Sequence, residues 1–329
     1  MLFKTSPILR SYATLGEVNF AEIQNTVKQT EDKHIIPVLG LTQYNLLNTA
    51  YNTATGETLA DVKLAALLEQ CRKVIAPYVC YYYTPKVDGS LSAGGFRRQE
   101  TQTAKSAYQY QVTNFREANL QEAEAATENL IRFLEANKTD YTAWAESDEF
   151  KAYRSLFIKT ALEFNTIFPS HTPCRNYYAM RSKMMDVEEL GMRNFLGDAL
   201  FTVLKDKDKA GTAFTEKENV LIVKIKKAIA NITVAAAVPT LNVRISDGGI
   251  TLTTVGARTT NDAIASRSAA DANALNTLIN ACNASGKQWI ESAAAYMRAN
   301  ATDFDTWPGN VITEIIIKNT AGTAVYGVF

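Results

Sequence analysis

Histidine is nearly missing from this chain of 329 residues, which has two, His34 and His171. They lie far apart in the sequence and neither adjoins a cysteine, so no zinc ligand set and no Ser–His or Cys–His catalytic pair is indicated. We expect His34 to lie at a helix end and His171 in a loop. The sequence therefore predicts no catalytic, cofactor-binding or metal-binding residue, and a protein that is not an enzyme.

Net charge is missing as well, because 34 Lys and Arg residues balance 34 Asp and Glu residues. Proteins whose main task is to hold nucleic acid are usually basic, since contacts with phosphate supply most of their affinity. The composition disfavours that task and leaves room only for a local basic patch.

Paired cysteines and long apolar runs are also missing. None of the four cysteines forms a CxxC pair, and Cys71 and Cys80 fall within one predicted helix. At the α-helical rise they are about 13 Å apart, which is too far for a disulfide. No apolar run approaches the ~20 residues of a membrane span, and the first residues lack the apolar core of a secretory signal. We expect free thiols in a chain made in the cytoplasm, with no membrane segment.

Nucleotide-binding glycine loops are not indicated, although paired glycines occur twice. In "PTLNVRISDGGITLTT" (239–254), strand-like sequence follows the glycines, whereas a dinucleotide fingerprint needs a helix there and a βαβ context. Alternating β-branched residues around DGG predict a β-hairpin near 241–255. The related "PKVDGSLSAGG" predicts a second hairpin near 86–101.

What the sequence does contain is an internal repeat. Residues 67–95 align without a gap on residues 221–249, with eight identities in 29 positions, where average residue usage predicts roughly two. "VLGLTQYNLL" (38–47) matches "FLGDALFTVL" (195–204), and "EANKTDYTAW" (135–144) matches "RANATDFDTW" (298–307). Because the blocks keep their order in both halves, the chain is predicted to be a tandem duplication.

The repeat predicts a mainly α fold, in which each copy has short helices, one long helix and a small β-hairpin. Apolar residues at spacings of three and four predict a buried helical face over residues 68–82, in a helix that ends at Pro85, and its copy ends at Pro239. The second long helix is predicted over about 262–299, with a break at "NASGK". Nine extra residues of the second copy fall either in that break or just after the hairpin.

Four regions follow from this pattern. The first repeat covers 1–147. The region 148–173 consists of a connecting helix (148–168) followed by a proline-containing linker. The second repeat covers 174–308. A C-terminal β-hairpin or arm covers 309–329.

Charged and aromatic clusters are expected to serve packing or solvation. "KDKDK" (205–209) is typical of a solvated loop, and "DVEE" (186–189), like Glu31 and Asp32 in the first copy, of a solvated helix face. Arg97 and Arg98 are candidate contacts with DNA, and "YVCYYY" (78–83) could stack bases. The second copy lacks both features, which favours packing. We expect two similarly folded halves that leave no acid-lined pocket.

The C-terminal segment is a candidate subunit interface, because an isolated apolar hairpin pairs readily by strand addition. The alternative is that this segment packs over the sheet of its own domain. Its apolar residues are Val311, Ile312, Ile315, Ile316, Ile317, Val325, Tyr326, Val328 and Phe329.

Several packing signatures resemble a family of head–tail connector (neck or adaptor) proteins of Bacteroidetes phages and prophages. They are "HIIPVLGLTQYNLL", the helix ending "YYYTP", the glycine turn near residue 94, "LIRFLEANKTDYTAW" and "FIKTALEFNTIF". The resemblance covers mainly residues 20–170. It implies a virion structural subunit, made in the bacterial host cytoplasm, that forms a ring between portal and tail and lets DNA pass through.

The resemblance also implies partners. It favours a twelve-fold homo-oligomeric ring that matches the portal, and the duplication offers the alternative of six chains presenting twelve units. The neighbours are the portal and tail proteins, contact with DNA is transient and non-specific, and no cofactor or membrane is implied.

Two other functions stay open. One is a different phage assembly module, such as a tail- or head-completion protein. The other is an enzyme whose site is built from residues far apart in sequence, which a pocket of converging carboxylates or a cleft around His34 would favour.

Overall fold

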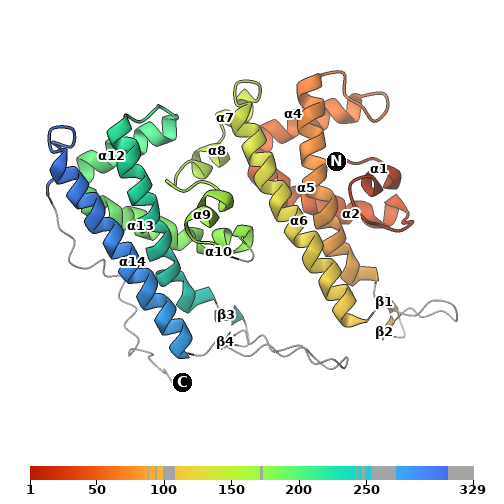
Figure 1. Ribbon diagram of the computed structural model, residues 1–329. Helices are drawn as coiled ribbons and strands as arrows, with labels where there is room; N and C mark the ends of the chain where they lie inside the picture. Colours follow the sequence, from red (N-terminus) through yellow and green to blue (C-terminus); the bar gives the residue numbers. More distant parts are fainter. Residues whose placement is uncertain are drawn as a thin grey trace. The chain divides into compact units, whose positions relative to one another are not determined.

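The computed structural model divides the chain into two units, Met1–Tyr153 and Arg154–Phe329. Each unit has its own hydrophobic core. The structure describes residues 1–87, 89–92, 95–98, 108–170, 173–241, 243–246, 249–252 and 272–309 (Figure 1).

Unit 1 is built from short helices that surround a pair of long ones. A π-helical turn, η1 (Glu31–Ile35), joins the second helix to the third. Strand β1 (Gly89–Ser92) pairs antiparallel with β2 (Gly95–Arg98). The helices are α1 (Ser6–Arg10), α2 (Phe20–Thr30), α3 (Ile36–Leu39), α4 (Leu41–Thr53), α5 (Val62–Val87), α6 (Gln109–Ala136), α7 (Thr142–Ala145) and α8 (Asp148–Tyr153).

Unit 2 repeats the order of these elements from α1 to α6. A second π-helical turn, η2 (Val187–Met192), stands at the place of η1. Strand β3 (Val243–Ser246) pairs antiparallel with β4 (Gly249–Leu252). The helices are α9 (Ala161–Ile167), α10 (Pro173–Asp186), α11 (Arg193–Leu196), α12 (Asp198–Ala210), α13 (Glu216–Leu241) and α14 (Ala272–Ala299). In each unit the two longest helices lie side by side, α5 with α6 and α13 with α14 (Figure 1).

The predicted mainly α fold and the predicted duplication are both confirmed. The short strand pairs lie where the sequence predicts hairpins. The turns that would connect their strands lie outside the described residues, and so does the C-terminal segment. The three β-hairpins therefore stay predictions.

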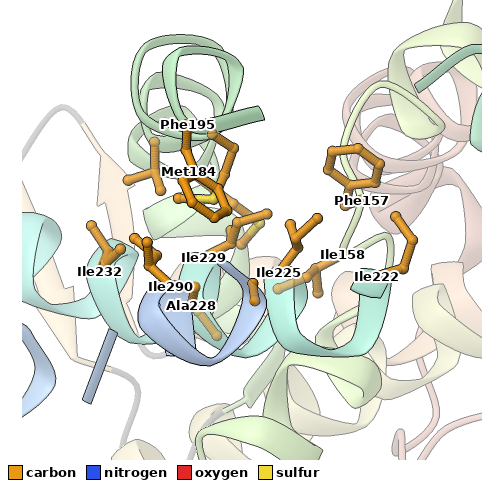
Figure 2. Packing of buried hydrophobic residues seen from close by; sticks show 14 of the residues in the cluster. Phe157, Ile158, Met184, Phe195, Ile222, Ile225, Ala228, Ile229, Ile232 and Ile290 are labelled. Carbon is orange, nitrogen blue, oxygen red and sulfur yellow. The ribbon is translucent and has the colours of Figure 1, made fainter. Parts of the chain in front are cut away.

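The core of unit 2 follows from the apolar periodicity of α13. Its isoleucines at positions 222, 225 and 229 are buried, and Figure 2 shows them in one layer with Met184 of α10 and Phe195 of α11. Burying a side chain of this size stabilises a fold by about 1.5–3 kcal/mol. A stripe with this spacing therefore specifies both the helix and the side on which its neighbours pack.

Polar contacts also repeat between the units. The indole N–H of Trp144 donates to the carbonyl of Val38 at 2.9 Å, and that of Trp307 donates to the carbonyl of Phe195 at 3.0 Å. A surface ion pair repeats as well, Lys63 with Asp140 at 2.6 Å and Lys217 with Asp303 at 2.5 Å. The duplication thus extends to individual hydrogen bonds.

The predicted connecting helix over 148–168 is wrong. Helix α8 ends at Tyr153, and α9 begins at Ala161 after Thr160, whose hydroxyl accepts a hydrogen bond from the N–H of Glu163. Between them Leu156, Phe157 and Ile158 are all buried, and a helix cannot place three successive side chains on one face. This irregular segment belongs to unit 2, which begins well before the predicted start at residue 174.

The predicted helix ends also need correction. Helix α14 runs unbroken through "NASGK", so the nine extra residues of the second copy lie between β4 and α14. Helices α5 and α13 each continue two residues beyond their proline, to Val87 and Leu241. A proline so close to the C-terminal end removes one helical hydrogen bond and still permits the last turn.

Candidate functional site

A buried glutamate marks the same point in both units. Glu31 opens η1 and Glu188 lies in η2, and their side chains are 0% and 1% exposed. π-helical turns are rare and occur often at functional sites. The solvated helix face predicted for these two residues is wrong, because both carboxylates face inward.

Each glutamate binds the first segment of its own unit. Oε1 of Glu31 accepts a hydrogen bond from the backbone N–H of Leu2 at 2.6 Å, and Oε1 of Glu188 accepts one from the N–H of Phe157 at 2.8 Å. Leu2 and Phe157 are therefore equivalent, which places "LFKT" (2–5) on "FIKT" (157–160). The sequence carries a signal of this match, because both segments contain Leu-Phe followed by Lys-Thr, as "LFKT" (2–5) and "LFIKT" (156–160). The two pairs align together only if one residue is inserted.

The two units supply different cations to this carboxylate. In unit 2 the ammonium group of Lys205 binds Oε2 of Glu188, and the Lys205 side chain is 4% exposed. In unit 1 the equivalent position holds Asn48, whose Oδ1 accepts a hydrogen bond from the α-amino group of Met1. That amino group lies 4.0 Å from Oε2 of Glu31, which also accepts a hydrogen bond from the Tyr44 hydroxyl at 2.7 Å.

Burial governs the electrostatics of both glutamates. It raises the pKa of the Glu31 and Glu188 carboxyls, and it lowers the pKa of Lys205, because each charged form loses hydration. The ion pair between Glu188 and Lys205 opposes both shifts. Removing one partner of such a pair leaves an unpaired buried charge, at a cost of about 3–5 kcal/mol. These charges are part of the fold.

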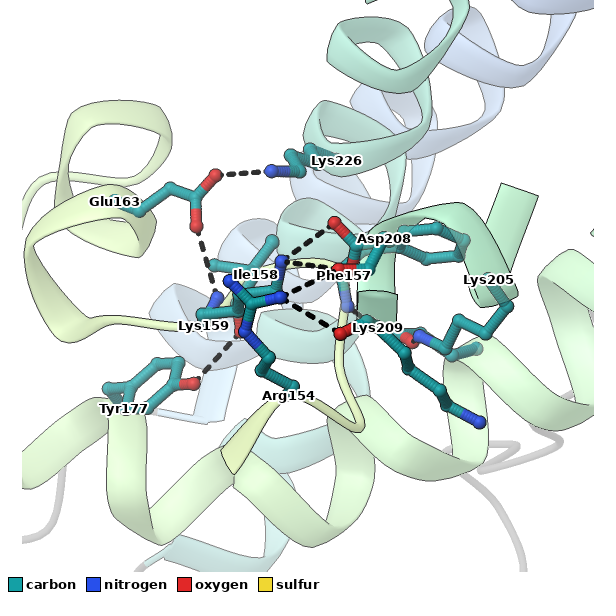
Figure 3. A network of polar contacts seen from close by, with 11 residues as sticks. Arg154, Phe157, Ile158, Lys159, Glu163, Tyr177, Lys205, Asp208, Lys209 and Lys226 are labelled. Atoms are coloured by element: carbon teal, nitrogen blue, oxygen red, sulfur yellow. Dashed lines mark hydrogen bonds and ion pairs between the residues drawn. The ribbon is translucent and has the colours of Figure 1, made fainter. Parts of the chain in front are cut away.

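A lysine of the same first segment binds the end of a helix in each unit. Nζ of Lys4 donates to the carbonyls of Ala54 and Gly56 at 3.3 and 3.1 Å, just beyond α4. Nζ of Lys159 reaches the Asp208 carboxylate at 2.7 Å, near the end of α12 (Figure 3). A cation at this end of a helix opposes the helix dipole.

The solvated loop predicted for "KDKDK" is wrong for Lys205 and Asp208, which are buried in α12. Figure 3 shows the polar contacts that surround them, including the guanidinium of Arg154, which donates to the carbonyl of Lys209 at 2.8 Å. The alternating charges therefore pair inside the unit as well as facing water.

A pocket of about 460 Å³, lined mostly by residues with polar or charged side chains, opens beside Glu31 in unit 1. Two carboxylates line it, so the expectation that the chain has no acid-lined pocket is wrong. Both oxygens of Glu31 already accept hydrogen bonds from the protein, which limits its use as a general base. The lining residues are Met1, Gln24, Asn25, Lys28, Glu31, Asp32, Tyr44 and Asn48.

His34 packs against tyrosines. Its ring stacks on Tyr78 with centroids 3.6 Å apart, and Nε2 lies 2.9 Å from the hydroxyl of Tyr82. Burial and the nearby charge of Lys33 lower the pKa of His34 to about 4. The Arg116 guanidinium lies over the ring of Tyr81, 4.7 Å from its centroid. These contacts use ring faces that bases would need, which favours packing as the role of "YVCYYY".

The other predicted residues are placed in part. Arg97 and Arg98 lie on β2, opposite Ser90 and Gly89. His171 and the candidate interface residues of 311–329 lie outside the described residues. Within the described ranges, no three His, Cys, Asp or Glu side chains are grouped so as to hold a metal ion.

The four cysteines are free thiols, as predicted. In the part of the chain that the structure describes, no helix has the length and apolar character needed to cross a membrane.

Comparison with known proteins extends the evidence for duplication. The model of a family of unknown function (DUF6712) matches the chain twice, over residues 35–154 and 192–313. Each match spans the short helix that follows the positive-φ glycine (α4 or α12), the two long helices, and the tryptophan, Trp144 or Trp307. No curated protein and no solved structure matches the chain.

Proposed function

This chain belongs to DUF6712, a family of unknown function, and we propose that it is a virion structural protein: a ring-forming head–tail connector (neck adaptor) subunit. It docks between portal and tail and surrounds the DNA channel. The packing signatures that resemble connector proteins support this proposal, and they lie mainly in unit 1.

The duplicated helical unit is the observation that carries the proposal. Each unit uses charged side chains to hold its own first segment: the buried Glu31 and the half-buried Lys4 in unit 1, and the buried Glu188 and Lys205 with the half-buried Lys159 in unit 2. Such contacts stabilise two units of similar fold. This supports a subunit of a shell or ring that must keep its shape while DNA passes.

Ring assembly requires a heterologous interface, in which one surface of a subunit meets a different surface of the next. We assign the apolar arm of 311–329 to this interface, where it adds strands to a neighbour. Twelve copies are favoured, and six copies with twelve units are the alternative. Arg97 and Arg98 on β2 are the proposed transient contacts with DNA phosphate.

The mass of the purified full-length protein, measured by native mass spectrometry and viewed as class averages by electron microscopy, tests the ring. Closed rings of twelve or six chains are expected. A protein that stays monomeric at the concentration of a virion neck contradicts the proposal.

Deleting 311–329 separates a connector from other phage assembly modules. The deletion is expected to give filled heads that fail to join tails. A matched full-length variant changed at the exposed Val62, Val62→Ala, keeps the arm and is expected to join tails. Normal tail joining by the deletion variant contradicts the assigned interface.

An enzyme is the second candidate, and the acid-lined pocket beside Glu31 favours it. Asp32 lines the pocket, and replacing it by Asn changes the charge and keeps the shape. A connector predicts that Asp32→Asn supports normal particle assembly. Loss of biological activity in a variant that still forms rings favours the enzyme instead.

A further inference from the structure

We infer that residues 316–319 bind to unit 1 of a second copy of this chain, on the surface that holds residues 2–5, and displace those residues from it. The inference rests on the proposed function, because it takes the arm of 311–329 as the subunit interface, and it names the surface that receives the arm. It follows from a short sequence pattern whose first two occurrences bind in equivalent ways.

The pattern consists of two apolar residues, a lysine, and a threonine or asparagine. Among all lysines of the sequence, only Lys4, Lys159 and Lys318 follow two apolar residues and precede one of these two residue types. The first two occurrences are the first segments of units 1 and 2, and the third belongs to the arm, outside the described residues. The three segments are "LFKT" (2–5), "FIKT" (157–160) and "IIKN" (316–319).

Each position of the pattern has one role in both units. The backbone N–H of the first residue binds the buried glutamate, Glu31 or Glu188, and the lysine binds near the C-terminal end of α4 or α12. The last residue is the N-cap of α1 or α9, where asparagine serves as well as threonine. The two apolar residues are completely buried: Leu2, Phe3, Phe157 and Ile158. Residues 316–319 thus have a suitable residue type at every position.

The place of the third segment in the chain indicates its partner. Phe157 follows Trp144 by 13 residues, and Ile316 follows the equivalent Trp307 by 9. The segment after Trp144 binds the unit that comes next, unit 2. By the same order, the segment after Trp307 binds a further unit, and unit 1 of a second copy offers the matching surface. Such a contact joins different surfaces of two copies, as ring closure requires.

The first segment of unit 1 is the one that can be displaced, because its polar contacts are weaker. Lys159 pairs with the buried Asp208 carboxylate at 2.7 Å, whereas Lys4 donates to two backbone carbonyls. The Thr160 hydroxyl accepts a hydrogen bond from α9, whereas no N–H of α1, within the described residues, binds the Thr5 hydroxyl. Removing Lys159 would leave a buried carboxylate without its cation, which is costly. Residues 157–160 therefore keep their place, and residues 2–5 yield theirs.

Ring formation by full-length variants tests the inference. In Ile316→Asp a charge replaces the first apolar residue of the pattern, and burying it without a partner is unfavourable. Val325→Asp places the same charge in the arm outside the pattern. Native mass spectrometry is expected to find Ile316→Asp as a monomer and Val325→Asp in rings of the unmodified size. Rings of Ile316→Asp overturn the inference. Loss of rings in both variants also overturns it and leaves the connector proposal standing, because the arm then binds through its whole length.

A peptide separates this inference from the proposed function, since the measurement needs no ring. The peptide "EIIIKNTA" (314–321) is added to full-length Ile316→Asp, whose own arm does not compete, and hydrogen exchange is followed in proteolytic fragments. At saturation, exchange of residues 2–5 is expected to speed by about tenfold, because they are displaced, while that of residues 157–160 stays unchanged. The Ile316→Asp form of the peptide is the control. Unchanged exchange of residues 2–5, or equal effects of both peptides, overturns the inference whether or not rings form.

A photo-crosslinking residue in place of Ile316 tests whether the contact joins two chains. Unlabelled and isotope-labelled full-length chains are mixed before assembly, so that a crosslink between chains has a mixed mass. Crosslinks are expected to reach fragments of the other chain that contain Glu31 or Arg72, since both residues bind the backbone of Leu2. Crosslinks confined to one chain, or found in unit 2 alone, overturn the inference.

Discussion

Gly40 and Gly197 occupy equivalent positions in the two units, and the same backbone conformation requires glycine at both. Their φ angles are +73° and +75°, in a region that residues with a Cβ rarely adopt, and each lies directly before a helix. A Cβ at Gly40 would lie 2.8 Å from a Glu149 carboxylate oxygen, and one at Gly197 would lie 2.7 Å from Cδ of Pro308. The Glu149 carboxylate is the flexible end of a side chain, whereas the neighbour of Gly197 is the ring of Pro308.

Alanine at either glycine is therefore expected to destabilise its unit by about 1–3 kcal/mol, with the larger loss at Gly197, where the proline ring cannot rotate away. Gly16→Ala serves as the control, because a Cβ added there would meet no atom within 4 Å and its φ is not positive. Urea unfolding of the three variants measures the difference. Equal stability of Gly197→Ala and Gly16→Ala would show that the strain is absent.

His34 carries a pH dependence that the tyrosine stack imposes. The pKa of His34 falls from 6.5 to about 4 in the fold, so the unfolded chain binds a proton in this window and the folded chain does not. The free energy of unfolding is thus expected to decrease as the pH drops from 6.5 toward 4, by about 1–2 kcal/mol after allowance for partial exposure.

His34→Phe keeps a ring against Tyr78 and removes the titration. Its unfolding free energy is expected to change less with pH over this window than that of the unmodified chain, in urea titrations at several pH values. Tyr82→Phe retains His34 and should keep the dependence. Identical pH profiles for the chain and His34→Phe would exclude this residue as the source.

At the scale of elements, the long helix pairs show how the same framework accepts different side chains. Tyr78 and Tyr82 of α5 fill space beside His34, whereas the equivalent stretch of α13 is rich in buried alanine. Gly286 on α14 lies so near α13 that a Cβ would be 2.5 Å from Cγ1 of Ile232. The glycine of "NASGK" serves a close helix contact and does not interrupt the helix.

Gly286→Ala tests this contact. Alanine raises intrinsic helix stability by about 0.8–1 kcal/mol, but overpacking costs about 1–3 kcal/mol, so net destabilisation is expected. Adding Ile232→Ala creates room for the new methyl group, and the double variant should lose less than the sum of the single variants. Additive losses in thermal or urea unfolding would contradict direct contact between the two positions.

At the scale of the whole molecule, each unit contains its own core and its own polar contacts. The second unit includes residues 154–160, because Phe157 donates to Glu188 and Tyr177 donates to the carbonyl of Ile158 at 2.9 Å. The boundary after Tyr153 therefore differs from the predicted start of the second repeat at 174.

Two fragments test this boundary. The fragment 154–329 is expected to fold cooperatively on its own, with helical circular dichroism and a sharp unfolding transition. The fragment 174–329 lacks Phe157, Ile158 and Lys159 and leaves Glu188 with one partner fewer, so it should be markedly less stable or unfolded. Equal stability of the two fragments would restore the predicted boundary.

Local patterns were enough to predict the helical class, the duplication and the core face of α5. Apolar spacing acts over a few turns, and repeated blocks can be compared directly. The candidate site was missed because charged residues in "DVEE" and "KDKDK" look alike whether they face water or one another. Lys205 and Asp208 also adjoin solvated neighbours in sequence, so no local pattern marks them as buried.

The succession of two copies of one helical unit can be read from the amino acids alone, since periodic apolar residues and matching blocks are properties of neighbouring positions. Which charges are buried, where unit 2 begins, and that Glu31 and Glu188 each bind the first segment of their own unit became visible in the folded structure alone. Those outcomes depend on residues such as Leu2, Glu31 and Asn48 meeting in space, and the free energy of a buried charge is set by the partners that surround it.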